Sequence, residues 1–133
     1  TYLKSSFDTV GMLIMLRINT YNKQEMVTRG IPALVPYFQR IDTMIWPRFN
    51  EVFTLNLQSV KVFQIIPNSL DTRPHFIVRR YAEYATSVLS LTSQFKHPDV
   101  IGNLSLLREE IISLLDRLAS QVQVDNSKER VKK

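Results

Sequence analysis

The sequence contains no cysteine, so neither a disulfide nor thiol chemistry can occur in this chain. It has only three glycines, which rules out a recognisable glycine-rich loop of the kind that cradles phosphate groups. Histidine is almost as scarce. His75 and His97 lie in separate segments, whereas a zinc site needs clustered cysteine, histidine or carboxylate ligands. The sequence therefore predicts no metal site and no cofactor.

Long hydrophobic runs are also missing. The longest, residues 10–16 (VGMLIML), is far shorter than the ~20 apolar residues that cross a bilayer. No signal-peptide pattern precedes this run. A length of 133 residues and a hydrophobic content of 44% are typical of one ordinary globular domain. The chain starts at Thr1 rather than at a methionine, and we expect it to be a fragment of a longer protein.

Positive charge is only mildly in excess. Of the net charge of +5, residues 124–133 contribute +2, which leaves +3 for residues 1–123. A nucleic-acid-binding domain usually concentrates its basic residues on one face, and this mild excess does not indicate such a face. We expect a folded domain over residues 1–123, followed by a basic, disordered tail over residues 124–133.

Hydrophobic periodicity predicts a first helix over residues 2–28. The apolar residues that recur at steps of three and four are Leu3, Phe7, Val10, Ile14, Ile18 and Tyr21. Between Gly11 and Leu16 the other faces are apolar too, and such a helix is either central in its bundle or covered by a partner. We favour the buried central helix. Gly30 and Pro32 end the segment, because glycine suits a left-handed cap and proline cannot continue the turn.

A second helical pattern begins near Pro32 or Pro36. Its apolar positions are Ile41, Ile45, Phe49, Phe53, Leu57 and Val60. Pro47 lies in its middle, where proline removes a hydrogen bond and clashes with the preceding turn. We therefore expect either a kinked helix or two helices that meet at the step from Trp46 to Pro47. Trp46 is interpreted as a packing anchor rather than as a platform for a ligand.

Residues 66–74 have the composition of a loop, and a third helix is predicted from Pro74, because proline is favoured at the first helical position. Its apolar stripe comprises Ile77, Tyr81, Tyr84, Ala85, Val88, Leu91 and Phe95. Arg79, Arg80 and Glu83 lie largely off that stripe, at spacings that let each arginine pair with the glutamate for ~0.2–0.5 kcal/mol. A solvated, internally paired helix face therefore explains these arginines without a bound phosphate or RNA.

A last helix is predicted from Asn103, a good N-cap residue. Its apolar residues at three- and four-residue steps are Leu104, Leu107, Ile111, Leu114 and Leu118. No stretch shows the sustained period-two alternation of a strand. The sequence predicts an all-α protein, folded as an antiparallel helical bundle of four to five helices.

The sequence indicates no catalytic residues. Nucleophilic catalysis needs a serine near a base and an orienting acid, and Ser87, Ser90 and Ser93 have no such neighbours in the sequence. Glu109 and Glu110 are adjacent, so they point ~100° apart on a helix, which is poor geometry for a carboxylate pair. We therefore expect a protein that is not an enzyme.

Three stretches resemble a known family. Residues 2–16 (YLKSSFDTVGMLIML), 46–49 (WPRF) and 75–89 (HFIVRRYAEYATSVL) are similar to the C-terminal region of the vacuolar protein sorting-associated protein 52 family. They occur in the family's order, and the resemblance spans roughly residues 1–95. The last helix is similar only in pattern, and residues 124–133 are not aligned.

The resemblance implies part of a rod-like subunit of the Golgi-associated retrograde protein (GARP) complex, with coiled-coil segments before this domain. Such a complex captures endosome-derived vesicles at the trans-Golgi network. The implied partners are a Golgi Rab-type small GTPase in its GTP state, the other GARP subunits and SNARE proteins. The implied location is cytoplasmic, peripheral on trans-Golgi network and endosome membranes through the complex, with no transmembrane segment and no nucleic acid.

Two places could form the partner-binding surface. One is the first helix, if a second apolar face is left uncovered by the bundle; its contact residues would be Met12, Met15 and Leu16. The other is the start of the third helix, where three arginines would act as rim charges; these are Arg73, Arg79 and Arg80. We rank the first helix higher, because a helix that is apolar all round needs a cover.

Three alternatives remain open at this point. The domain could be an assembly surface for other tether subunits or SNAREs without GTPase binding. It could bind nucleic acid through the same three arginines and the neighbouring aromatic rings, although the modest charge argues against this. It could also touch a membrane through its basic tail, whose net charge of +2 is too weak to anchor the chain alone.

Overall fold

The computed structural model describes residues 2–63, 76–93 and 97–131. For Tyr2 and residues 122–131 it describes the backbone only. Every regular element in these ranges is helical, which confirms the predicted all-α class. The elements are α1 (Tyr2–Ser5), α2 (Thr9–Thr28), the 3-10 turn η1 (Pro32–Leu34), α3 (Val35–Lys61), α4 (Phe76–Thr92) and α5 (Pro98–Val131). No described helix is long and apolar enough to cross a membrane.

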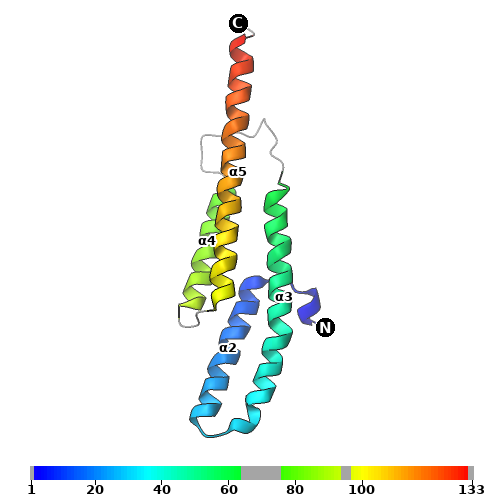
Figure 1. Ribbon diagram of the computed structural model, residues 1–133, viewed down its shortest axis with the longest axis vertical. Helices are drawn as coiled ribbons and strands as arrows, with labels where there is room; N and C mark the ends of the chain where they lie inside the picture. The colour runs from blue at the N-terminus through cyan, green and yellow to red at the C-terminus, as the bar shows by residue number, and fades with distance from the viewer. Residues whose placement is uncertain (1, 64–75, 94–96, 132–133) are drawn as a thin grey trace.

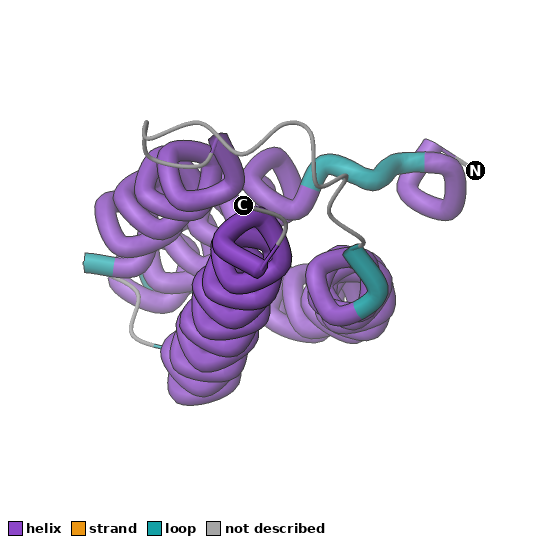
Figure 2. Tube along the Cα trace, turned by 90° about the horizontal axis from the view of Figure 1, so that it is seen from above, coloured by secondary structure: helices purple, strands orange, loops and turns teal. Residues whose placement is uncertain are grey.

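The helices form two antiparallel hairpins that are staggered along the long axis of the molecule (Figure 1). Helix α2 pairs with α3, and α4 pairs with α5. Helix α2 also contacts α4, and α3 contacts α5, so the four helices surround one core where the hairpins overlap. Figure 2, which looks along the long axis, shows the helices grouped around that axis. The result is the predicted helical bundle, and its shape is elongated.

Helix α2 begins later than the sequence predicted, because Asp8 interrupts the expected helix over residues 2–28. Asp8 is the N-cap, and its Oδ1 accepts a hydrogen bond of 2.8 Å from the backbone N–H of Gly11. A Cβ at Gly11 would lie 2.5 Å from the Asp8 Oδ2, so a larger residue there would require the carboxylate to shift. Residues 2–5 form the separate helix α1, which lies against α3.

Residues 6 and 7, between α1 and α2, are fastened to α3 by Arg48. The guanidinium donates from Nη2 and Nε to the Ser6 carbonyl oxygen at 3.0 and 3.3 Å. The same group lies 5.1 Å from the centre of the Phe7 ring and pairs with Glu51 at 2.8 Å. Arg48 therefore connects the chain ahead of α2 to the middle of α3.

The end of α2 has the geometry that the sequence predicted for Gly30. Its φ of 72° is left-handed, a region that side chains other than glycine rarely adopt. The N–H of Gly30 donates to the Val27 carbonyl at 3.0 Å, and the N–H of Ile31 donates to the Met26 carbonyl at 2.9 Å. This pair of bonds is a Schellman motif, which satisfies the last carbonyls of α2 and turns the chain toward α3.

Helix α3 continues through Pro47 without interruption, so the alternative of two separate helices is wrong. The missing N–H of Pro47 removes one intrahelical hydrogen bond, but Ile45 and Phe49 on either side are buried and hold the helix in place. Trp46 is partly buried against the core and meets Phe49 edge to face, with ring centres 5.6 Å apart. The interpretation of Trp46 as a packing anchor is therefore confirmed.

Helix α5 begins at Pro98, more than a turn before the predicted N-cap Asn103. Proline is well suited to the first helical position, and the carbonyl of His97 accepts a hydrogen bond of 3.1 Å from Val100. The predicted stripe of this helix is confirmed: Leu104, Leu107, Ile111, Leu114 and Leu118 are all buried.

Several expectations concern segments near or outside the limits of the described residues. The backbone continues as α5 to Val131, so residues 124–131 are helical where a disordered tail was expected. The domain boundary at residue 123 stays a prediction. The predicted loop over residues 66–74, the predicted helix start at Pro74 and the candidate contact Arg73 lie outside the described residues.

Candidate protein-interaction surface

Metal-ligand clusters and the serines considered above can be checked among the described residues. No group of three or more His, Cys, Asp or Glu side chains among them could hold a metal ion. The hydroxyl of Ser87 donates to the Glu83 carbonyl at 2.9 Å, and that of Ser93 donates to the Ser90 carbonyl at 2.9 Å. These hydroxyls bond to the backbone of their own helix. The surface of the molecule is therefore the place to look for function.

The inner face of α2, defined by Met12, Leu13 and Leu16, is part of the core. Their side chains are 0%, 1% and 0% exposed, and they pack with Phe49 and Val52 of α3. Asn19 is buried on the same side, where its Nδ2 donates to the Phe38 carbonyl at 2.8 Å and to Asp42 Oδ1 at 2.6 Å. The amide thus fixes the rotation of α2 against α3, because it is satisfied only in this orientation.

The outer face of α2, defined by Ile14, Ile18 and Tyr21, is exposed. At 100° per residue these positions lie on the side of the helix opposite the inner face. Their exposed fractions are 41%, 53% and 67%, large for apolar side chains in the middle of a domain. Met15 is 37% exposed at the edge of this face. Helix α2 therefore presents a continuous apolar strip, about two turns long, that stays exposed among the described residues.

This arrangement corrects the residues proposed from the sequence for partner contact. Met12 and Leu16 are completely buried and cannot touch a partner, whereas Met15 remains accessible. The sequence identified two apolar faces on this helix. It assigned partner contact to the face that contains Met12 and Leu16, whereas the structure exposes the face that contains Ile14 and Ile18. The polar residue at position 19 was the only signal in the sequence, and it became decisive only once Asp42 and the Phe38 carbonyl were seen beside it.

The arginines of α4 lie elsewhere, near the end of α4 that is remote from the turn between α2 and α3 (Figure 1). Arg79 Nε pairs with Glu83 Oε1 at 3.3 Å, as the i,i+4 spacing predicted, and both side chains are exposed. The guanidinium of Arg80 lies 5.5 Å from the centre of the Phe76 ring. The structure therefore does not join the two candidate regions into one site.

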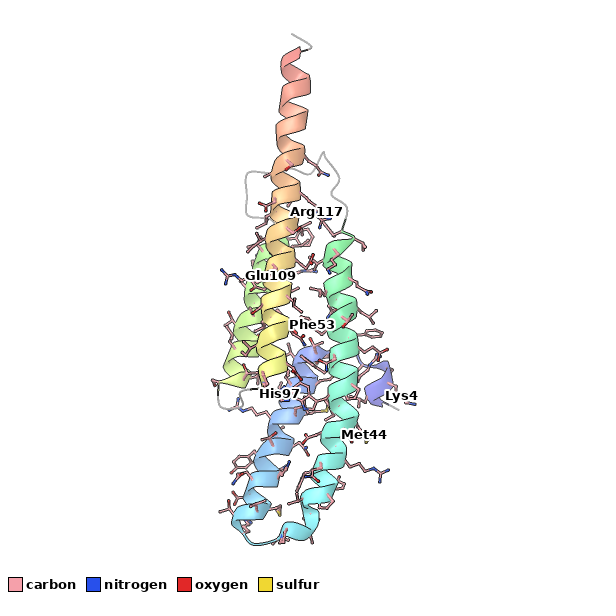
Figure 3. The ribbon with its side chains drawn as sticks, in the orientation of Figure 1. Lys4, Met44, Phe53, His97, Glu109 and Arg117 are labelled. Carbon is pink, nitrogen blue, oxygen red and sulfur yellow. The ribbon has the colours of Figure 1, made fainter. Side chains whose placement is uncertain are left out.

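Charged groups elsewhere in the bundle serve mainly to connect helices. Lys61 of α3 pairs with Glu110 of α5 at 3.2 Å. Arg117 of α5, labelled in Figure 3, donates to the Lys61 carbonyl at 2.9 Å and so caps the end of α3. At the other end of α5, the His97 ring lies 4.0 Å from the Trp46 ring. None of these arrangements resembles a phosphate-binding cluster.

Comparison with known proteins gives a consistent result. A family model described as Vps52, C-terminal, matches residues 1–131. The chain is 36% identical over 120 residues to vacuolar protein sorting-associated protein 52 B of Arabidopsis thaliana, covering 88% of the chain and 17% of the relative. It is 29% identical over 124 residues to the human homolog of protein 52, covering 91% and 17%.

A fungal relative extends the range. Protein 52 of Schizosaccharomyces pombe is 28% identical over 124 residues, covering 90% of the chain and 24% of the relative. The chain thus spans only about a fifth of the length of these curated relatives. No solved structure matches the chain.

Proposed function

The chain belongs to the Vps52 family, and on that premise we propose that it is a non-catalytic interaction domain of a vesicle tether that acts in endosome-to-trans-Golgi retrograde transport. Within this proposal, the domain works in the cytoplasm as part of the GARP complex and reaches trans-Golgi network and endosome membranes through that complex. Its further partners are the other tether subunits and SNARE proteins. The match of the family's C-terminal model along almost the whole chain supports this placement.

The partner that we propose for this domain is a Rab-type small GTPase in its GTP state. The observation that carries the proposal is the exposed outer face of α2, with Met15 at its edge. Protein interfaces have an apolar centre and a polar rim, and the switch segments of small GTPases become ordered by the bound γ-phosphate. An apolar strip on a helix whose inner face is packed in the core is suited to recognise such an ordered surface. The reason is that the strip loses little conformational freedom on binding.

Titration calorimetry with GTP-loaded and GDP-loaded GTPase tests this proposal. We expect binding only in the GTP state and at least a tenfold loss of affinity in Ile18→Asp, since a charge at the centre of an interface is costly. Val27→Asp is the matched control: Val27 is 52% exposed against 53% for Ile18, and it projects from another side of α2. Equal affinity for both nucleotide states, or equal effects of the two substitutions, would contradict the proposal.

A second candidate function rests on α5. Ile101 and Ile112 are 44% and 47% exposed, and they share one side of α5 because they are about three turns apart. Leu115 lies on the same side. This strip favours an assembly surface for other tether subunits or SNAREs. Reconstitution of the complex with Ile112→Asp would show a weakened subunit contact without a change in GTPase affinity.

A further inference from the structure

An open groove of about 420 Å³ lies between α3, α4 and α5, beyond the N-terminal end of α2. Its walls come from the last turns of α3, the first turns of α4 and the middle of α5. The residues that matter here are Phe53, Val60, Ile77, Tyr81, Leu107 and Arg80. Apart from Arg80, these are apolar or aromatic side chains. The groove is therefore mainly apolar, with one positively charged side chain among its described lining residues.

The groove exists because α2 is shorter than α3. In Figure 1 the start of α2 lies near the middle of α3. Below that level α2 covers the face of α3 that carries Ile45, Phe49 and Val52. Above it the same face continues with Asn56 and Val60 at helical spacing, and these residues line the groove instead. The groove therefore continues the place that α2 fills further down along α3.

The junction between α2 and the groove is a defined contact. Thr9, the first residue of α2, is buried, and its side chain hydrogen-bonds the hydroxyl of Tyr84, which lines the groove. Burial raises the pKa of Tyr84, and the bond from Thr9 opposes this shift only in part. The floor of the groove is thus a packed, neutral surface.

The shape of the groove specifies an α-helix as its occupant. Its wall on α3 runs from Phe53 to Val60, which corresponds to about 10 Å, or two helical turns. Walls made of neighbouring helices are best filled by another helix, which presents apolar residues at i, i+3, i+4 and i+7. The neutral polar groups Asn56 and Ser59 lie along the α3 wall and suit the border of such a helix.

The charge of the groove specifies the sign of the helix that it accepts. Arg80 is the one charged side chain among its described lining residues, and it lies at the rim against the Phe76 ring. No carboxylate of the described residues forms an ion pair with Arg80, whereas the adjacent Arg79 is paired with Glu83. An acidic side chain beside the apolar strip of the occupant would therefore complement the rim.

We propose that the α3–α4–α5 groove binds an amphipathic helix of a partner protein, about two turns long, through an apolar strip flanked by acidic residues. The surface is separate from the outer face of α2, so this inference goes beyond the proposed GTPase contact. It gives the domain two binding sites, one on the outer face of α2 and one between the two hairpins.

The test uses three fluorescein-labelled, helix-stabilised peptides of equal length and one Leu/Ala backbone pattern. One carries glutamates beside the leucine strip, one carries lysines there, and one has the glutamate composition in scrambled order. Fluorescence anisotropy with the 133-residue chain measures their affinities. We expect the glutamate peptide to bind about fivefold more tightly than the lysine peptide, the size of one rim ion pair, and the scrambled peptide not to bind.

Two arginine variants make the test specific to the groove. Arg80→Glu should reverse the preference, so that the lysine peptide binds more tightly. Arg79→Glu, a change of equal charge on the same helix but outside the groove lining, should preserve the preference for glutamate. Ile18→Asp on the outer face of α2 should leave all peptide affinities unchanged, which separates this site from the GTPase site.

Three results would overturn the inference. They are equal effects of the two arginine variants, binding that ignores the order of the leucines, and no binding at all. Sedimentation of the chain alone addresses a second copy as the occupant. A dimer that Arg80→Glu dissociates would assign the groove to self-association and reject a partner helix.

Discussion

The two faces of α2 carry equally apolar residues and have opposite fates. Met12, Leu13 and Leu16 are buried against α3, whereas Ile14, Ile18 and Tyr21 face outward. Hydrophobicity alone therefore does not determine which face enters the core. The rotation of α2 is determined by polar groups, because Asn19 forms its hydrogen bonds only when the inner face points to α3. The outer face then stays exposed.

The largest expected difference is between two alanine substitutions, one on each face of α2. Leu16→Ala should destabilise the domain by about 2–5 kcal/mol, because it leaves a cavity in the core. Ile18→Ala should change stability by no more than about 0.5 kcal/mol, because its side chain is already exposed. Urea denaturation followed by circular dichroism measures both. Similar losses from the two substitutions would erase the distinction between the faces.

Removing the buried amide should have the next largest effect. Asn19→Ala leaves the Phe38 carbonyl and Asp42 without their donor, at a cost of about 1–3 kcal/mol. A double-mutant cycle with Asp42→Ala should show coupling, since each residue matters through the other. Strictly additive losses in the cycle would mean that this hydrogen bond does not fix the rotation of α2.

Smaller effects on stability are expected at two glycines, one in the turn from α2 to α3 and one in α5. Gly30→Ala should cost about 1 kcal/mol, because alanine is strained at the φ of 72° observed there. Gly102→Ala in α5 should instead raise the melting temperature slightly, since it replaces a helical glycine in open space with a good helix former. Differential scanning calorimetry of the two variants should therefore show shifts of opposite sign.

The smallest effect concerns the contact between α2 and α4 through Tyr84. Burial raises the pKa of this phenol in the folded state above its usual value near 10. Its protonated form is favoured by folding, so this contribution to stability is complete below pH 10 and is lost as the pH rises through the raised pKa. Tyr84→Phe should therefore lessen the fall in melting temperature above pH 10. An identical fall in both proteins would place Tyr84 in contact with water.

Sequence reasoning succeeded where a single periodic stripe specified a single face. The leucine-rich stripe of α5 is buried as predicted, and so are three of the six members of the α3 pattern, Ile45, Phe49 and Phe53. Arg79 and Glu83 also pair as their spacing predicted. In these cases local spacing alone determined the outcome.

The missed features have two different physical reasons. The helix starts at Asp8 and Pro98 follow known capping preferences and could have been read from the sequence. The inner face of α2 and the α3–α4–α5 groove could not, because each depends on how the two hairpins slide and rotate against each other. That stagger is set by contacts between residues far apart in the chain, such as Asn19 with Asp42 and Thr9 with Tyr84.

Arg48 gives the domain a mechanical property. Its two bonds to the Ser6 carbonyl, its position over the Phe7 ring and its pair with Glu51 join the residues ahead of α2 to α3. A tensile load on the chain before Asp8 is therefore transferred to α3 before it reaches the first turn of α2. The packed inner face of α2 does not have to peel away for this load to be carried. In optical-tweezers pulling from the N-terminal end, Arg48→Ala should lower the force at which α2 detaches, while chemical denaturation changes little.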